Sequence, residues 1–462
     1  MTENLPRVSE ESTPLMQAAI GVSATIAFMS NHRENRLRRD IGSFGAAFLV
    51  LNGLIGAGIF ALPGKVAVNA GLFSPWLFLV VGALFLSVVL VFAELASYYD
   101  ETGGPVLYAS DAFGPLAGFG TGWLLFLSRT TAFAANATVM ASYLGSLFDV
   151  LAGDLPRMLI ITTVILGLTW ANILGVRDGV RAMGVFTFLK AAPLLILVLL
   201  GFQYVSGSTL LPSAELLVDD LGSTTLLMIY AFVGFETVGV TAGETTHPRR
   251  TLPRVLVGTV VSIGLLYFLI VLVFVSVIDQ GDYANATLVD VGRALAGTAG
   301  AFAITLAAVF SIGGNLAGSM LAAPRLVFSL AENRQLPRWF AHVHPRYATP
   351  DRCIVVMGAL ALGLALTGSF VKLAVASSVA RLLSYIICIA SLPAIRRGAS
   401  DAVRQDAYRL KGGYLIPVLG LMICLWLLMQ SKAESWIAVG VLLLAGFAFY
   451  AFEKRFGLAE QP

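Results

Sequence analysis

The sequence predicts an all-α integral membrane protein with about twelve transmembrane helices. Hydrophobic residues make up 57% of the chain and charged residues 12%, whereas about a quarter of the residues in a soluble domain are charged. Apolar runs of roughly 20 residues, the length that crosses a bilayer, follow one another closely from residue 42 to residue 452. The connections between them are short, so we expect one membrane domain and no second folded unit.

The predicted spans cover residues 42–66, 74–98, 116–146, 158–174, 182–205, 222–243, 252–278, 298–324, 353–370, 374–395, 414–430 and 434–452. Before them, residues 15–30 form a shorter apolar run that follows acidic rather than basic residues, which argues against a cleaved signal peptide. We expect this run to lie on the membrane surface or to be poorly ordered. An additional span is the alternative.

Lys and Arg residues gather in alternate loops. With the N-terminus placed inside, the opposite side of the membrane holds only Lys65, Arg157, Arg293, Lys372 and Lys432. Cytoplasmic loops of membrane proteins carry the excess of Lys and Arg, so we expect both termini in the cytoplasm. The predicted location is the cell membrane, as in a bacterial inner-membrane protein.

The first and sixth spans contain glycines where a lipid-facing helix would favour Leu or Val. The first reads FLVLNGLIGAGIFALPG and includes Gly53, Gly56 and Gly58, and the sixth reads LLMIYAFVGFETVGVTAGE, with Gly234 in its middle. A single glycine can serve close helix packing, but these two segments lie five spans apart. They therefore occupy corresponding places in two halves of five helices, as expected for an inverted-repeat transporter with discontinuous helices.

This internal symmetry divides the chain into four expected parts. They are a cytoplasmic N-terminal extension (1–40), a first five-helix repeat (41–205), a second five-helix repeat (206–395), and two last helices with a cytoplasmic C-terminus (396–462).

The two breaks predict the kind of cargo. Unwinding a helix frees amide N–H and carbonyl groups, which lipid cannot satisfy. A zwitterion suits such a site, because its carboxylate can accept from N–H groups at the positive end of a half-helix while its ammonium donates to carbonyls. The sequence therefore favours an amino acid as the transported molecule.

Several stretches together resemble one family. IGAGIFALP (55–63), GGPVLYASDAFGP (103–115) and GFETVGVTAGETTHPRRTLPR (234–254) are similar to segments of the amino acid-polyamine-organocation (APC) permeases. The loop 324–350 and the segment ARLLSYIICIASLPAIRR (380–397) extend the resemblance over nearly all of the chain after residue 38. The resemblance implies the LeuT-type fold, in which the first and sixth helices are broken around the substrate.

The resemblance also implies two sets of substrate-binding residues. The first, whose amides would hold the carboxylate, is Ile55, Gly56, Ala57, Gly58 and Ile59. The second, which would supply carbonyls to the amine and an aromatic lid, is Tyr230, Ala231, Phe232, Val233 and Gly234. Many members of the family have Ser where this chain has Ala57, so backbone amides must carry more of the carboxylate binding here.

Lys190 lies within the fifth predicted span, about 13 Å deep at 1.5 Å per residue. By the resemblance it matches a lysine that in some members replaces the sodium ion of sodium-coupled relatives. Burial disfavours the charged ammonium, so Lys190 could bind and release a proton during transport. The alternatives are a permanently charged strut to the broken first helix, and a side chain that snorkels to the inner surface.

Other charges inside the spans are functional candidates, since such residues are rare in a bilayer. Glu236 directly follows the sixth-helix break. We interpret it as a protonation site or gate or, alternatively, as a member of a structural ion pair. Arg129, in the middle of the third span, is a candidate partner. Arg381 lies near the predicted outer end of its span, where it could snorkel and serve structure only.

Soluble-enzyme motifs are absent from the sequence, including the GxxxxGK[ST] and HExxH patterns, and Cys353, Cys388 and Cys424 are widely separated. We therefore expect no enzyme activity, cofactor, metal or nucleic-acid partner, and transport that is secondary rather than driven by ATP.

The leading hypothesis is proton-coupled uptake of a neutral amino acid. Apart from Glu236, no Asp or Glu lies deep in a predicted span to receive a cationic cargo. The alternatives are an exchanger or exporter of amino acids or polyamines, and a nutrient sensor that does not transport.

Overall fold

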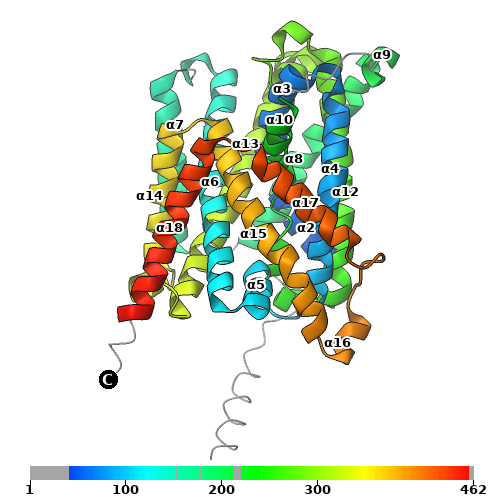
Figure 1. Ribbon diagram of the computed structural model, residues 1–462. Coiled ribbons are helices and arrows are strands. Elements are labelled where there is room, and N and C mark those ends of the chain that lie inside the picture. Colours follow the sequence, from blue (N-terminus) through cyan, green and yellow to red (C-terminus); the bar gives the residue numbers. More distant parts are fainter. Residues whose placement is uncertain (1–40, 152, 176–178, 212–219, 241, 457–462) are drawn as a thin grey trace, which may run out of the picture.

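The computed structural model describes residues 41–456 except 152, 176–178, 212–219 and 241. The regular structure of these residues is helical (Figure 1). The one strand-like contact among them is an isolated parallel bridge between Ile41 and Thr245. The predicted all-α class is therefore confirmed, whereas the apolar run 15–30 lies outside the described residues.

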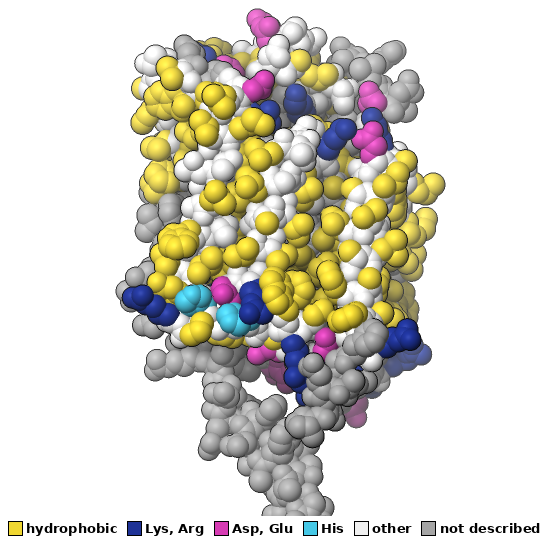
Figure 2. All heavy atoms as spheres, turned by 90° about the vertical axis from the view of Figure 1, so that its left-hand side faces the viewer, with side chains coloured by type: hydrophobic (Ala, Val, Ile, Leu, Met, Phe, Trp, Pro, Cys, Tyr) yellow, Lys and Arg dark blue, Asp and Glu magenta, His cyan; other side chains and the backbone are white. Residues whose placement is uncertain are grey.

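Seven helical segments of the described chain are long and apolar enough to cross a membrane. They are Gly58–Ser97, Asp154–Leu174, Leu221–Gly239, Pro248–Val277, Leu288–Glu332, Phe370–Gly398 and Ala433–Arg455. Figure 2 shows one side of the molecule, on which hydrophobic side chains cover the middle and charged side chains gather toward the two ends. A bilayer requires this distribution, since its core is apolar and its two surfaces are polar.

The main helices, in chain order, are α2 (Ser43–Leu54), α3 (Gly58–Ala70), α4 (Ser74–Ser97), α5 (Pro105–Phe113), α6 (Pro115–Leu147), α7 (Asp154–Leu174), α8 (Gly179–Gly201), α10 (Leu221–Phe232), α11 (Thr237–Val240), α12 (Pro248–Val277), α13 (Leu288–Glu332), α14 (Asp351–Thr367), α15 (Phe370–Gly398), α16 (Asp401–Asp406), α17 (Leu415–Met429) and α18 (Ala433–Phe456). Helices α4 and α6 agree closely with predicted spans, because long apolar runs define them and Pro75 and Pro115 mark their starts.

Helix α13 begins well before the predicted start of its span at residue 298. Thr287 and Asp290 form a capping box, in which the Thr287 hydroxyl accepts from the amide of Val289 at 3.2 Å and the Asp290 carboxylate accepts from the amide of Thr287 at 2.9 Å. A kink at Ala296 and Gly297, where Gly297 has φ +61°, joins this first part to the longer remainder of the helix. The predicted span covered only the part after this kink.

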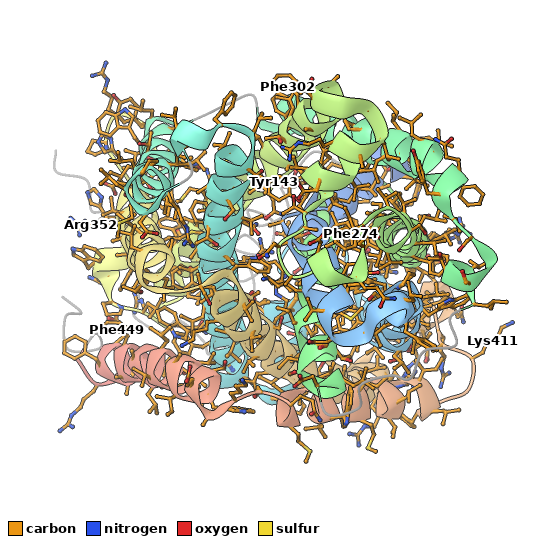
Figure 3. All side chains as sticks on the ribbon, turned by 90° about the horizontal axis from the view of Figure 1, so that it is seen from above. Tyr143, Phe274, Phe302, Arg352, Lys411 and Phe449 are labelled. Atoms are coloured by element: carbon orange, nitrogen blue, oxygen red, sulfur yellow. The ribbon has the colours of Figure 1, made fainter. Side chains whose placement is uncertain are left out.

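The helices pack in a bundle in which α4 lies against α12, and α6 lies against both α13 and α15. Seen from above, α17 and α18 lie along one edge of the molecule, where Phe449 marks α18 and Lys411 the segment before α17 (Figure 3). The last two helices are therefore peripheral to the bundle that contains the glycine-rich helices.

Both glycine-rich spans are interrupted where their sequences predicted a break. Residues 55–57 separate α2 from α3, and residues 233–236 separate α10 from α11. Gly234 has φ +114°, a conformation that favours glycine. A Cβ on Gly234 would lie 2.6 Å from the carbonyl oxygen of Gly53, and one on Gly53 would lie 2.8 Å from that of Gly234. The last turn of α2 is thus in direct backbone contact with the second interruption.

Candidate functional site

Lys190 of α8 contacts the first interruption. Its Nζ donates to Oδ1 of Asn52 and to the carbonyl oxygen of Ile55, both at 2.9 Å. The side chain is fully buried, so the snorkelling alternative is wrong. Within the described part of the chain, Lys190 forms no ion pair with a carboxylate. This geometry is that of a strut, and a change in proton occupancy would act on these hydrogen bonds.

Two hydroxyl groups also bind carbonyls at this interruption. The hydroxyl of Tyr267, on α12, donates to the carbonyl oxygen of Leu54 at 2.9 Å. The hydroxyl of Ser311, on α13, donates to that of Ile55 at 3.0 Å. An unsatisfied carbonyl in hydrocarbon costs several kcal/mol. Side chains of α8, α12 and α13 therefore replace the hydrogen bonds that the interrupted helix has lost.

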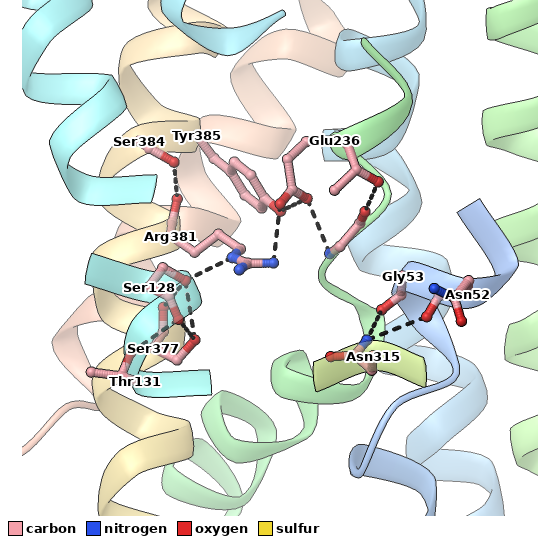
Figure 4. Close-up of polar contacts among 12 residues, drawn as sticks. Asn52, Gly53, Ser128, Thr131, Glu236, Asn315, Ser377, Arg381, Ser384 and Tyr385 are labelled. Atoms are coloured by element: carbon pink, nitrogen blue, oxygen red, sulfur yellow. Dashed lines mark hydrogen bonds and ion pairs between the residues drawn. The ribbon is translucent and has the colours of Figure 1, made fainter. Parts of the chain in front are cut away.

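Glu236 organises the second interruption (Figure 4). Its Oε2 accepts from the amide N–H of Gly234 at 3.0 Å and from the hydroxyl of Tyr385 at 2.7 Å. Its Oε1 forms an ion pair with Nη1 of Arg381 at 3.0 Å. Both charged side chains are almost completely buried. The carboxylate thus joins the unwound backbone to α15.

Arg381 was expected near the outer surface, and the structure corrects this interpretation. The residue is only 5% exposed, and its Nε donates to Oγ of Ser128 on α6 at 2.8 Å. Helix α15 begins at Phe370, which puts Arg381 about 16 Å along the helix at 1.5 Å per residue. The predicted start of the span at residue 374 underestimated that depth.

Arg129 was the candidate partner for Glu236, but Arg381 forms the ion pair instead. Arg129 lines the same cavity as Glu236 and Arg381. It makes no hydrogen bond or ion pair with another residue that the structure describes. The cavity wall therefore contains two guanidinium groups and one carboxylate, so it carries an excess of positive charge.

The cavity is lined by residues of the two interruptions and of α2, α3, α6, α10, α11, α13 and α15. They are Gly53, Leu54, Gly56, Ala57, Gly58, Arg129, Ala132, Asn136, Tyr230, Val233, Gly234, Glu236, Thr237, Asn315, Ser319 and Arg381. Among the described residues, no group of three or more His, Cys, Asp or Glu side chains could hold a metal ion.

A chain of polar side chains crosses the cavity wall. The hydroxyl of Tyr230 donates to Oδ1 of Asn136 at 2.6 Å, and Nδ2 of Asn136 donates to Oδ1 of Asn315 at 2.8 Å. Nδ2 of Asn315 in turn lies 3.3 Å from the carbonyl oxygen of Gly53. This chain connects α10, α6 and α13 to the first interruption, so a ligand that displaced one member would affect the others.

The predicted site residues divide into two groups. Eight line the cavity: Gly56, Ala57, Gly58, Arg129, Tyr230, Val233, Gly234 and Glu236. Five lie behind its wall: Ile55, Ile59, Lys190, Ala231 and Phe232. The Phe232 ring packs against the rings of Phe78 and Tyr267, with centroids 6.4 and 5.8 Å away. The aromatic ring that faces the cavity is that of Tyr230.

Sequence reasoning missed Asn136 and Thr237 as cavity residues and favoured a structural role for Arg381. A polar Asn136 within a long apolar helix was the available signal, since such residues face the interior of a bundle. Asn315 and Ser319 of α13 also line the cavity, and Asn315 bonds to Asn136 on α6 as well.

The ends of the interrupted helices give the cavity its chemistry. The first amide N–H groups of α3 have no acceptor in their own helix and carry partial positive charge. The last carbonyl groups of α10 have no donor in theirs and carry partial negative charge. A ligand with a carboxylate and an ammonium a few bonds apart can satisfy both ends at once.

The sequence of the chain is similar to those of several known proteins. A family model described as amino acid permease matches residues 41–451. The serine/threonine exchanger SteT of Bacillus subtilis (strain 168) is 27% identical over 91% of this chain and 98% of its own length. From the same organism, the branched-chain amino acid permease BcaP is 25% identical over 91% of this chain and 94% of its own length. The methylthioribose transporter of that organism is 24% identical over 92% of this chain and 95% of its own length.

Proposed function

Because the chain belongs to the amino acid permease family, as its motifs suggested, we propose that it carries an amino acid across the cell membrane by alternating access. The family is one of transporters, and the seven apolar helical segments make the chain a multi-pass membrane protein. The observation that carries the proposal is the single cavity that the ends of two interrupted helices share. We propose further that transport is secondary, with the chain acting as a permease rather than an enzyme.

The proposed architecture is the LeuT-type fold with twelve spans. Residues 41–205 and 206–395 form its two inverted five-helix repeats, with the first and sixth helices interrupted, and residues 396–462 add two helices at the edge. Support comes from the position of the interruptions, five predicted spans apart, and from the peripheral place of α17 and α18 (Figure 3). The distribution of Lys and Arg supports cytoplasmic termini.

The proposed binding mode uses both interruptions. The substrate carboxylate accepts from amide N–H groups of the segment 55–59, at the N-terminus of α3, where the helix dipole favours an anion. The ammonium donates to carbonyls of the segment 230–234, at the end of α10. Tyr230, whose ring lines the cavity, covers the bound molecule. Ala57 offers no hydroxyl, which agrees with binding through the main chain.

Lys190 is the proposed proton-coupling residue. Its ammonium donates hydrogen bonds to the carbonyl of Ile55 and to the side chain of Asn52. Loss of a proton would weaken these hydrogen bonds and so loosen the first interruption. Glu236 acts as a gate, since its carboxylate accepts a hydrogen bond from the amide of Gly234 in the second interruption. One proton that moves down 100 mV releases about 2.3 kcal/mol, roughly a 50-fold gradient of a neutral substrate.

A neutral amino acid is the proposed cargo. Arg381 neutralises Glu236, so the cavity offers no unpaired carboxylate to a cationic side chain, and the guanidinium of Arg129 would repel one. Exchange of one amino acid for another is the second candidate, favoured by the similarity to a protein that is named an exchanger. The same charge distribution disfavours polyamines. A sensor without transport activity has less support, since the relatives are named as transporters.

Counterflow into proteoliposomes tests the proposal. The purified chain is reconstituted with one unlabelled amino acid inside, and entry of the labelled form is measured for a panel of amino acids and amines, with and without a pH gradient. We expect at least one neutral amino acid to exchange. The absence of counterflow for every amino acid would contradict the function. Counterflow without a response to the pH gradient would leave exchange as the mechanism and contradict proton coupling.

A further inference from the structure

A second cavity lies at the end of the bundle where α12 begins, away from the substrate site. Its volume is about 590 Å³, and its walls include the side chains of Arg249, Arg250, Arg254, Asp406 and Tyr408. Three arginines on two successive turns of one helix concentrate positive charge in this hollow. Neither the amino acid nor the proton of the proposed function has a role there.

The charges of this cavity are only partly balanced. Nη2 of Arg249 lies 2.8 Å from Oδ2 of Asp100, and Nη2 of Arg250 lies 2.9 Å from Oδ1 of Asp406. Arg254 is exposed and makes no hydrogen bond or ion pair with any residue that the structure describes. One guanidinium is thus available to an anion, beside two others that are already held in position.

An exposed apolar surface continues from the cavity along α12. Val257 and Gly258 line the cavity itself, and no atom lies within 4 Å of a Cβ built on Gly258. One and two turns further on, Val261 and Leu265 are 51% and 53% exposed. Residues three or four positions apart share a helix face, so Arg254, Gly258, Val261 and Leu265 form one stripe that runs from the charged hollow into the apolar part of the bundle.

We propose that this stripe and cavity bind an anionic phospholipid. The phosphate accepts charge-assisted hydrogen bonds from Arg254 and its neighbours, and an acyl chain lies along Gly258, Val261 and Leu265. Basic pockets at the surface level of membrane helices bind anionic headgroups in this way. A free phosphate would use the arginines but not the apolar stripe, and a zwitterionic headgroup would bring a positive charge of its own into the hollow.

The site would also join separate elements. Arg250 and Asp406 link α12 to α16, but both side chains are more than half exposed, and exposed ion pairs contribute little stability. A phosphate bound between Arg254 and Arg250 would hold the start of α12 beside the segment before α17. We therefore expect bound lipid to raise the thermal stability of the protein.

Thermal unfolding of the purified full chain in a neutral detergent tests the inference. Phosphatidylglycerol, phosphatidylcholine and inorganic phosphate are added separately, and native mass spectrometry counts the lipids that remain bound. We expect phosphatidylglycerol to raise the unfolding midpoint and to stay bound, with no comparable effect of the other two. The variant Arg254→Gln should lose most of the shift and the retained lipid, and Arg254→Lys should keep part of both.

Arg338→Gln is the matched control, since Arg338 is an exposed arginine outside the cavity, and it should behave as the unchanged chain. If Arg338→Gln and Arg254→Gln lose the same amount of the midpoint shift, the lipid binds by general charge and the site is overturned. An unchanged shift in Arg254→Gln would overturn the site in the same way. Stabilisation by inorganic phosphate alone would overturn the lipid as ligand. None of these measurements depends on transport, so the amino acid proposal can fail or hold independently.

Discussion

The Nζ of Lys190 lies 2.9 Å from the carbonyl oxygen of Ile55, a residue 135 positions earlier in the chain. This contact ties α8 to the interruption between α2 and α3. It places a titratable group on a backbone segment that the proposed substrate also contacts. Coupling between proton and substrate then needs no direct contact between them, because both act on the same unwound turn.

Replacing Lys190 by Met tests that connection. The change removes the donors to Ile55 and Asn52, and hydrogen bonds from a charged group contribute about 1.5–3 kcal/mol each. We expect uptake driven by a pH gradient to fall to background while counterflow persists at a reduced rate. Ser311 still donates to Ile55, so the site should survive. Gradient-driven uptake at the normal level in proteoliposomes would exclude Lys190 from coupling.

Gly234→Ala should abolish transport and destabilise the protein. The new Cβ would lie 2.6 Å from the carbonyl oxygen of Gly53, on a residue with φ +114°, and strained backbone of this kind costs about 1–3 kcal/mol before the clash is counted. Gly440→Ala is the control, because no atom lies within 4 Å of its added Cβ. Thermal unfolding and counterflow of the two variants should differ sharply, and similar values would refute the close contact.

The ion pair of Glu236 and Arg381 can be tested by a double-mutant cycle. Removal of one partner leaves a buried charge uncompensated, which costs about 3–5 kcal/mol. We therefore expect Glu236→Gln and Arg381→Gln each to destabilise strongly, and the double variant to be more stable than their sum predicts. The cycle of Glu236→Gln with Arg129→Gln should show much weaker coupling. Both cycles are measured as unfolding free energies. Stronger coupling of Glu236 to Arg129 than to Arg381 would restore Arg129 as the partner.

Arg129 should control discrimination against cationic substrates. It faces the cavity without an ion-pair partner in the described chain, so its guanidinium repels a second positive charge. In competition counterflow, Arg129→Gln should let lysine compete better by about tenfold, which corresponds to about 1.4 kcal/mol. Arg129→Lys keeps the charge and should exclude lysine as before. Unchanged competition in Arg129→Gln would assign the selectivity elsewhere.

Much of the fold could be predicted because it depends on local properties of the chain. The lengths of the apolar runs predicted helices such as α4 and α6, and the glycines of the first and sixth spans predicted where these helices break. Close approach of Gly53 to Gly234 has a local signature, since only glycine permits both the short distance and the positive φ. The start of α13 was missed because the charged residues Asp290 and Arg293 interrupt the apolar residues of its first turns.

The site was less predictable, because its polar contacts join residues that are far apart in sequence. Glu236 was recognised as a functional candidate from its position after Gly234. Its partner could not be read in the same way, since both Arg129 and Arg381 lie within spans and only the tilt and rotation of α6 and α15 decide which one reaches the carboxylate. Asn136 was overlooked for the same reason, as its partners Tyr230 and Asn315 belong to other helices.

The sequence by itself determined that this chain is a membrane protein of helices with two interruptions, and its motifs identified the family. Those properties follow from hydrophobicity and from glycine, which act on each segment separately. Only the tertiary structure decided that Lys190 holds Ile55, that Arg381 rather than Arg129 pairs with Glu236, and that Tyr230 rather than Phe232 faces the cavity. Such contacts depend on how packed helices are rotated against one another, and no single segment encodes that rotation.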